Sequence, residues 1–465
     1  ITNSGSMGAV VLSDGTNILI SSGSIGGSVT AGSASTNTIT NSGHIFGGVT
    51  MSGSGVDILS NASGGQIDGL VDLAAGDNVI KNAGTFQAGL TTGSDDDSVT
   101  NTGIIAGIIS LGDGVDTLIN SGTINGTAML GDGNDVVTST GNINGVFDLG
   151  NGDDKFNGGS NADTVRDGNG ADSIALGGGN DTYIATGATG SDAHDTIDGG
   201  MGIDTYDASD ATNSLQINLD TVTHDLSPGS PGSGVVAANT VSGTDVSEGF
   251  TDTVTGFENA NGGSADDIIY GSAAANVIDG GGGNDNLFGY AGNDTLNGGA
   301  DNDVLSGGTG NDTLSGGTGN DTLNGDAGND TLNGGADNDV LTGGAGKDTL
   351  TGGSGADKFV LTAITDSSVG SIGRDLITDF EQGTDKIDLS AIDAIATNAP
   401  ATNDAFTFIG TNVAFSHTAG ELRAYWTPTG QVIEGDVNGD AKPDFAVQLA
   451  DPTHAITLHG TDFFL

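Results

Sequence analysis

Residues 306–323 read SGGTGNDTLSGGTGNDTL, so the same nine residues occur twice in succession. Near-copies extend on both sides, and from 279 to 359 an Asp recurs every ninth residue, just after a Gly-rich stretch. Gly permits the positive φ angles and close backbone approach of tight turns. An apolar residue follows each Asp by two positions, which predicts a short strand with one inward side chain.

These Asp residues share one position of the nonapeptide: Asp285, Asp294, Asp303, Asp312, Asp321, Asp330, Asp339, Asp348 and Asp357. Two nonapeptides make a coil of about eighteen residues, so stacked coils place like turns above one another at about 4.8 Å. Like charges at that spacing repel strongly in a protein-like medium, and a dication between them reverses the sign of the interaction. We therefore expect cation binding and folding to be one event.

The repeat resembles the GGxGxDxUx nonapeptide of the RTX family, which folds as a parallel β-roll. The resemblance implies that Ca²⁺ lies between the turns of successive coils, held by Asp carboxylates and turn carbonyl groups, the hard oxygen ligands that it prefers. A second block, 154–206, predicts a degenerate calcium β-roll with Asp154, Asp163, Asp172, Asp181 and Asp204 in the same position.

Residues 1–153 repeat at 18–22 residues and predict about eight coils of a parallel β-solenoid. An Asn-x-Gly corner recurs, where Asn and Gly tolerate tight geometry and stacked Asn side chains can bond to one another. Positions 17, 37, 57, 78, 97, 116, 135 and 154 read Asn, Asn, Asp, Asn and then Asp throughout, and we expect this column to continue at Asp163. It predicts calcium along one edge from Asp97 through Asp116 and Asp135; the alternative is that these carboxylates face solvent.

Three further segments complete the predicted domains. Residues 207–260 are expected to be an irregular connection that includes a Pro/Gly/Ser loop at 225–234, and two weaker repeats extend the main calcium roll to 261–359. Residues 360–465 closely resemble the C-terminal domain of serralysin-type proteases. That resemblance implies a β-sandwich-like cap and export by a type I (ABC-transporter) machine, for which the terminal 462-DFFL-465 fits the signal.

A further calcium loop is predicted in this last domain. Asp436, Asn438, Asp440 and Asp444 place oxygen ligands at alternate positions of a tight loop, which suits Ca²⁺. A solvated Asn-Gly turn is the alternative, because position 447 is Val where a full EF-hand loop has Glu.

Composition narrows the function. Against 61 acidic residues stand 9 basic ones, which speaks against nucleic acid and against an anionic membrane surface. No apolar run is long enough to cross a bilayer. Because the chain has no Cys, it cannot be stabilised by disulfides, and bound metal ions are the obvious replacement. Because residue 1 is Ile, we expect a processed N-terminus or a longer native chain.

Catalytic motifs are missing from the sequence. No His is followed by Glu, so H-E-x-x-H is absent, and no G-x-S-x-G occurs. We therefore expect no enzyme but a bacterial extracellular or cell-surface protein: an all-β subunit of a surface layer, filament or matrix that docks head to tail through its open N-terminal strand edge. The alternatives are the secretion and stability module of a larger RTX exoenzyme and an adhesin stalk.

Overall fold

A computed structural model describes residues 1–32, 36–185, 194–225, 235–243, 251–395, 404–451 and 455–465. Among them the regular elements are strands, apart from one 3-10 turn at Gly460–Asp462, so the all-β prediction is confirmed. The predicted loop at 225–234 lies outside the described residues from 226 onward. The chain forms two compact units: unit 1 is 1–210 with 240–257, and unit 2 is 211–239 with 258–465.

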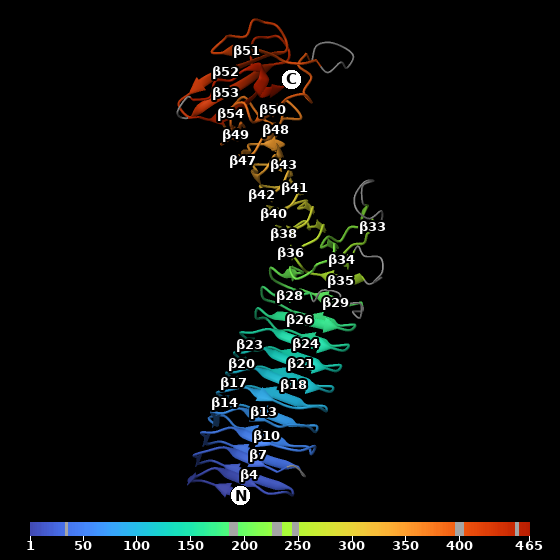
Figure 1. Cartoon of the computed structure of the whole chain (residues 1–465), viewed down its shortest axis with the longest axis vertical. Helices are drawn as coiled ribbons and strands as arrows, with labels where there is room; N and C mark the ends of the chain where they lie inside the picture. The colour runs from blue at the N-terminus through green and yellow to red at the C-terminus, as the bar shows by residue number, and fades with distance from the viewer. Residues whose placement is uncertain (33–35, 186–193, 226–234, 244–250, 396–403, 452–454) are drawn as a thin grey trace. The chain divides into compact units, whose positions relative to one another are not determined.

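Unit 1 winds through parallel sheets, one strand from each coil (Figure 1). Its first sheet contains β1 (Thr2–Asn3), β4 (Asn17–Ser21), β7 (Asn37–Asn41), β10 (Ile58–Asn61), β13 (Val79–Asn82), β16 (Ser98–Asn101), β19 (Thr117–Asn120), β22 (Val136–Ser139), β25 (Lys155–Asn157), β27 (Ser173–Ala175), β29 (Thr196–Asp198) and β35 (Thr251–Thr255), with β34 (Thr240–Gly243) antiparallel to β35.

Among the described residues the second sheet has eight strands, one from each coil. They are β2 (Ser6–Met7), β5 (Ser24–Ile25), β8 (His44–Ile45), β11 (Gln66–Ile67), β14 (Thr85–Phe86), β17 (Ile104–Ile105), β20 (Thr123–Ile124) and β23 (Asn142–Ile143). The third sheet contains β3 (Val10–Leu12), β6 (Val29–Ala31), β9 (Val49–Met51), β12 (Val71–Asp72), β15 (Leu90–Thr91), β18 (Ile109–Asp113), β21 (Ala128–Asp132), β24 (Phe147–Asn151), β26 (Thr164–Asn169), β28 (Thr182–Ile184) and β30 (Thr205–Asp207).

Alternation of inward and outward side chains builds the interior of unit 1. On the first sheet Val99 pairs with Leu118, nineteen residues on, and both are fully buried. At the neighbouring corner the Asn side chains stack as predicted: the Nδ2 of Asn82 donates to Asn101 Oδ1 at 2.9 Å, and Asn101 donates to Asn120 at the same distance. Each buried amide thus receives the hydrogen bond that its burial requires.

The coil changes after residue 157. The second sheet ends with β23, and the following coils have one strand in each of the other two sheets, because two nonapeptides now complete a coil. Coils of both kinds lie within unit 1.

Unit 2 repeats the two-sheet coil. One sheet contains β31 (Leu215–Asn218), β37 (Ile268–Tyr270), β39 (Asn286–Phe288), β41 (Val304–Thr309), β43 (Thr322–Gly328), β45 (Val340–Thr342), β46 (Ala345–Gly346), β48 (Lys358–Val360), β50 (Lys386–Asp388) and β55 (Phe463–Phe464). The other contains β36 (Asn259–Asn261), β38 (Val277–Gly282), β40 (Thr295–Ala300), β42 (Thr313–Thr318), β44 (Thr331–Ala336), β47 (Thr349–Ser354), β49 (Asp375–Ile377), β54 (Phe445–Ala450), β53 (Gly430–Asp436), β52 (Glu421–Thr427) and β51 (Thr407–Thr411).

Two predicted segments differ from expectation in detail. The 207–260 connection supplies β31, β34, β35 and β36 to the sheets, besides the antiparallel pair β32 (His224–Asp225) and β33 (Val235–Val236). Of these strands, β31 pairs with β37 and β35 pairs with β29, each more than fifty residues away, which no local pattern reveals. In 360–465, β52, β53 and β54 are antiparallel to one another, and β54 continues a parallel sheet of the roll beside β49.

Candidate calcium sites

The Asp residues of unit 2 form two ladders, one beside each sheet. In each ladder the backbone N–H of one Asp donates to Oδ1 of the Asp one coil further on; for Asp285 and Asp303 the distance is 2.8 Å, as it is for Asp303 and Asp321. One ladder contains Asp267, Asp285, Asp303, Asp321, Asp339, Asp357 and Asp385, and the other contains Asn276, Asp294, Asp312, Asp330, Asp348 and Asp375. The predicted stacking of like turns is confirmed.

The distinctive feature of most of these Asp residues is the second carboxylate oxygen. Asp303 is 1% exposed, and within the described residues its Oδ2 has no hydrogen-bond partner. The same holds for Oδ2 of Asp285, Asp294, Asp312, Asp321, Asp330, Asp339 and Asp348. A buried carboxylate oxygen without a donor is unfavourable, so each of these atoms requires a ligand.

In the repeats that end at Asp357, a glycine five residues before each Asp makes room for that ligand. A Cβ on Gly298 would lie 2.3 Å from Asp303 Oδ2 and 2.7 Å from the carbonyl oxygen of Gly316. Carboxylate and carbonyl oxygens thus converge beside a Cα without a side chain, and Gly280 and Gly289 repeat this cradle. Clustered hard oxygens of these two kinds fit Ca²⁺.

Electrostatics of the ladder point the same way. Burial raises the pKa of Asp285 from 3.8 to about 8; the backbone hydrogen bond from Asp267 opposes the shift, and the charges of Asp267 and Asp303 add to it. The pKa of Asp303 rises to about 7, mainly through burial. Without a cation the ionised ladder is therefore unfavourable, and a dication beside each carboxylate removes the penalty.

The edge column of unit 1 is also a ladder. Asp97 donates its N–H to Asp116 Oδ1 at 2.7 Å, and Asp116 and Asp135 continue to Asp154 in the same way. These carboxylates are 2% exposed or less, so the interpretation that they face solvent is wrong.

The predicted continuation of this column at Asp163 is also wrong. Asp154 donates instead to Asp172 Oδ1 at 2.7 Å, and Asp163 begins a second ladder with Asp181 and Asp204. The reason is that equivalent positions of a two-nonapeptide coil lie eighteen residues apart, whereas Asp163 belongs to the other half of the coil.

The solenoid part of this ladder lacks the glycine cradle. Five residues before Asp116, Asp135 and Asp154 stand Leu111, Leu130 and Leu149, all fully buried. Calcium at Asp97, Asp116 and Asp135 therefore stays a prediction.

Several ladder residues escaped the periodicity: Asp195, Asp252, Asp375 and Asp385. Insertions separate most of them from the preceding repeat, so the nine-residue spacing fails. Each nevertheless keeps the Asp-x-apolar pattern of the repeat, as in 195-DTI and 385-DKI. That local pattern could have identified them as ladder residues.

The predicted loop at 436–444 draws its oxygen-bearing side chains together. Asp436 is fully buried, and its carboxylate accepts backbone N–H groups of Gly439 at 2.7 Å and Ala441 at 2.8 Å. The Nδ2 of Asn438 donates to Asp444 Oδ1, and Asp440 lies 3.5 Å from Lys442. Backbone donors thus satisfy much of the loop, and calcium there stays a prediction.

The stacked coils and their carboxylate–carbonyl cradles define a calcium-binding parallel β-roll. A family model agrees: the RTX calcium-binding nonapeptide repeat (4 copies) matches residues 148–183, 188–208, 252–287, 261–296, 288–323, 297–332 and 324–359. The chain therefore contains RTX calcium-binding repeats, and multiple Ca²⁺ ions are its cofactors. Such repeats indicate a secreted protein. The serralysin-like domain and the export signal stay predictions.

Comparison with curated proteins gave no match. Among solved structures, the AlgE6R2 subunit of the Azotobacter vinelandii mannuronan C5-epimerase is 28% identical, over 35% of this chain and 91% of that one, with a TM-score of 0.25. A hyperactive, Ca²⁺-dependent, β-helical antifreeze protein from an Antarctic bacterium is 18% identical, over 71% and 81%, with a TM-score of 0.20. At these scores the superpositions carry no weight, and the assignment rests on the repeat and its geometry.

Proposed function

We propose that this chain is a structural protein that folds on extracellular Ca²⁺ and whose copies then associate into a surface layer, filament or matrix. Calcium-dependent folding follows from the ladders, since their carboxylates need a cation to be buried. Type I export fits that property, because a self-repelling, calcium-free chain remains unfolded and threadable. In the described residues, no helix is long and apolar enough to span a membrane.

One observation carries the assembly proposal: an outward face of unit 1 without acidic side chains, which we call the acid-free face. It consists of the outward positions of β4, β7, β10, β13, β16, β19 and β22: Ile18, Thr38, Ile58, Val79, Ser98, Thr117 and Val136 in one row, and Ile20, Thr40, Ser60, Lys81, Thr100, Ile119 and Thr138 in the next. Ile18, Ile20 and Ile119 are 56%, 47% and 45% exposed.

This face stands out against the charge of the whole chain. At a formal net charge of −52, two copies repel over most of their surface. The acid-free face offers instead mostly β-branched side chains, with two Ser and one Lys, against which a second copy can pack without opposing carboxylates. We therefore expect contact between copies through this face.

Light scattering and electron microscopy of the purified chain test the proposal. In millimolar Ca²⁺ we expect ordered polymers, which dissolve in chelator. Thr100→Asp with Thr117→Asp places charge on the acid-free face and should abolish assembly while leaving calcium binding intact. Ser110→Asp, an outward position of the third sheet, is the matched control and should assemble normally. Monomers in both calcium and chelator, or polymers from both variants, contradict the proposal.

The expected absence of catalysis forms part of the proposal. One surface hollow in unit 1 is lined by Asn142, Asn144, Ser160, Asn161 and Asn180 with Ile143, Ala162 and Gly179, and none of these is an acid or base. The alternative, a secretion and stability module of a larger exoenzyme, predicts a native secreted chain much longer than 465 residues with a catalytic motif. Intact mass of the secreted protein distinguishes the two, whereas a surface ligand bound by monomers would indicate an adhesin stalk.

A further inference from the structure

One carboxylate of unit 1 lies in a column of the interior that is otherwise mostly apolar. In the third sheet Phe147 pairs with Val165 and Gly150 with Gly168, so Asp167 stacks on Leu149. The same inward position is Leu111 and Leu130 in the two coils before. Asp167 is 1% exposed, as buried as the leucines that it follows.

Asp167 also occupies the position of the cradle glycine in the nonapeptide. Asp167 stands five residues before Asp172, where the repeats of unit 2 have the glycine of the cradle. A side chain at this point must approach the ladder carboxylate, because a Cβ on the equivalent Gly298 would lie 2.3 Å from Asp303 Oδ2. Here that side chain is itself a carboxylate.

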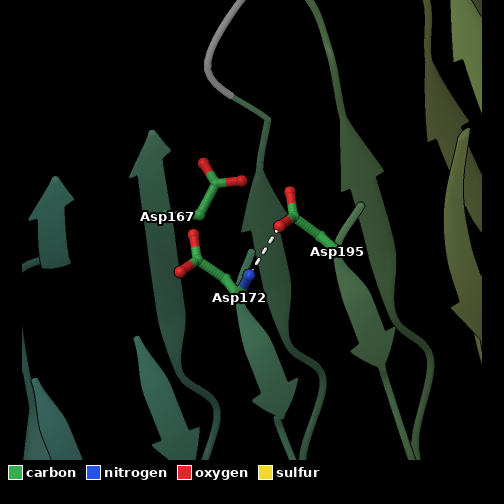
Figure 2. A group of neighbouring side chains, drawn as sticks. All are labelled: Asp167, Asp172 and Asp195. Carbon is green, nitrogen blue, oxygen red and sulfur yellow. Dashed lines mark hydrogen bonds between the residues drawn. The ribbon is translucent and has the colours of Figure 1, made fainter. Parts of the chain in front are cut away.

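Figure 2 shows the result: Asp167 in β26 of the third sheet lies beside Asp172 and Asp195, which directly precede β27 and β29 of the first sheet. One ligand oxygen from each lies within 4.8 Å of the others, and all three residues are buried. The backbone N–H of Asp172 donates to Asp195 Oδ1 at 2.7 Å, and the hydroxyl of Tyr183 donates to Asp167 Oδ2. The Oδ2 of Asp172 is buried in this group and, among the described residues, has no hydrogen-bond partner.

Nearby basic groups are engaged elsewhere. The guanidinium of Arg166 lies 3.9 Å from Asp148, whose side chain is on the outer surface like that of Arg166, and His194 Nδ1 is 2.8 Å from the carbonyl oxygen of Thr251. Three carboxylates at this separation in a buried setting cannot all be ionised without a cation among them.

We propose that Asp167, Asp172 and Asp195 hold a hard cation of the Ca²⁺ class inside unit 1, at a point where the nonapeptide offers glycine. Three carboxylates give this site more negative charge than a cradle of one carboxylate and carbonyl groups, so it binds Ca²⁺ and trivalent lanthanides more tightly. It fills before the ladders of unit 2 and holds β26, β27 and β29 together. The site does not depend on the assembly proposed above.

Counting bound calcium on the full chain tests the site. Asp167→Asn keeps the size of the side chain and its acceptor for Tyr183 but removes the charge. We expect equilibrium dialysis with elemental analysis to show one Ca²⁺ fewer per chain, lost from the tightest class. Asp113→Asn, at an exposed carboxylate of β18, is the matched control and should keep the full count. An unchanged count in Asp167→Asn means that the carboxylates share a proton instead, and it overturns the proposal.

Terbium luminescence gives a second measurement that does not require Asp167→Asn to fold. Because the Tyr183 hydroxyl contacts Asp167, Tb³⁺ in this site should be sensitised by tyrosine excitation at the first equivalents added. Tyr183→Phe should bind the same number of ions with several-fold weaker early emission. Early emission equal to that of the unsubstituted chain overturns the site, whatever the result for assembly.

Discussion

Replacement of Asp303 by Asn should change the stability of unit 2 in opposite directions with and without calcium. Burial raises the pKa of Asp303 from 3.8 to about 7. Since one pKa unit corresponds to about 1.4 kcal/mol, ionising Asp303 at pH 8 costs the calcium-free fold on the order of 4 kcal/mol. Asn removes that cost and keeps an oxygen for the N–H of Asp285. An Asn is compatible with this position, because Asn276 occupies a ladder position in the protein itself. Asn276 is 1% exposed, and its Oδ1 accepts the backbone N–H of Ser272.

In calcium the sign should reverse. The variant leaves a bound dication with one carboxylate fewer, and removing one partner of a buried ion pair costs about 3–5 kcal/mol. We expect Asp303→Asn to raise the calcium concentration at the folding midpoint at least tenfold, and to raise the pH at which the chelated protein unfolds.

Circular dichroism at pH 8 during calcium titration, and during pH titration in EGTA, measures both effects. The control is Glu381→Gln, which removes an exposed carboxylate of unit 2 that does not raise the pKa of Asp303, and it should change neither midpoint. If Asp303→Asn destabilises the protein equally in calcium and in EGTA, the ladder is held by packing and hydrogen bonds, and the reasoning from buried charge is refuted.

Three further outcomes are expected. Because folding raises the pKa values of the ladder carboxylates, the calcium-free fold binds more protons than the unfolded chain. The stability that these carboxylates contribute is fully present below about pH 4 and is lost as the pH rises through 6 to 8. The β-sheet signal in EGTA should therefore be greater at pH 5 than at pH 8. Gly298→Ala places a Cβ beside Asp303 Oδ2 and should weaken calcium binding at least tenfold by calorimetry, whereas Gly370→Ala, with open space around its Cα, should not. Glu434 is 4% exposed and lies 2.7 Å from the guanidinium of Arg423, so Arg423→Met leaves a buried carboxylate without this partner. Thermal melts should show that the variant is destabilised by about 3 kcal/mol. The double variant Arg423→Met with Glu434→Leu should largely regain the lost stability.

The nonapeptide determines much of this protein without any tertiary information. Each Leu two residues after an Asp is inward, each Gly-rich stretch is a turn, and two repeats close a coil, so the register of Leu287 with Leu305 follows from spacing alone. The same holds for the Asn corner of unit 1. These features are local and repeated, and stacking identical coils allows one register that keeps apolar side chains inside.

Where the repeat is interrupted, spacing alone could not predict which residues join the ladders. Asp195 and Asp375 rejoin the ladders across insertions, because strand pairing between coils restores a register that the spacing has lost. The sequence also could not show whether Asp97 and Asp116 face solvent or the interior, because the same spacing is compatible with both orientations.

The spacing of residues along the chain therefore predicts the coil length, the inward residues and an acidic column that requires calcium. Which carboxylates lie together depends on how the coils pair. This pairing in the tertiary structure divided the column into ladders in which each residue bonds to the one a full coil further on, and it placed Asp167 next to Leu149 and beside Asp172 and Asp195. The physical reason is that periodicity fixes neighbours along the chain, whereas the environment of a carboxylate is set by side chains that pairing brings from other coils.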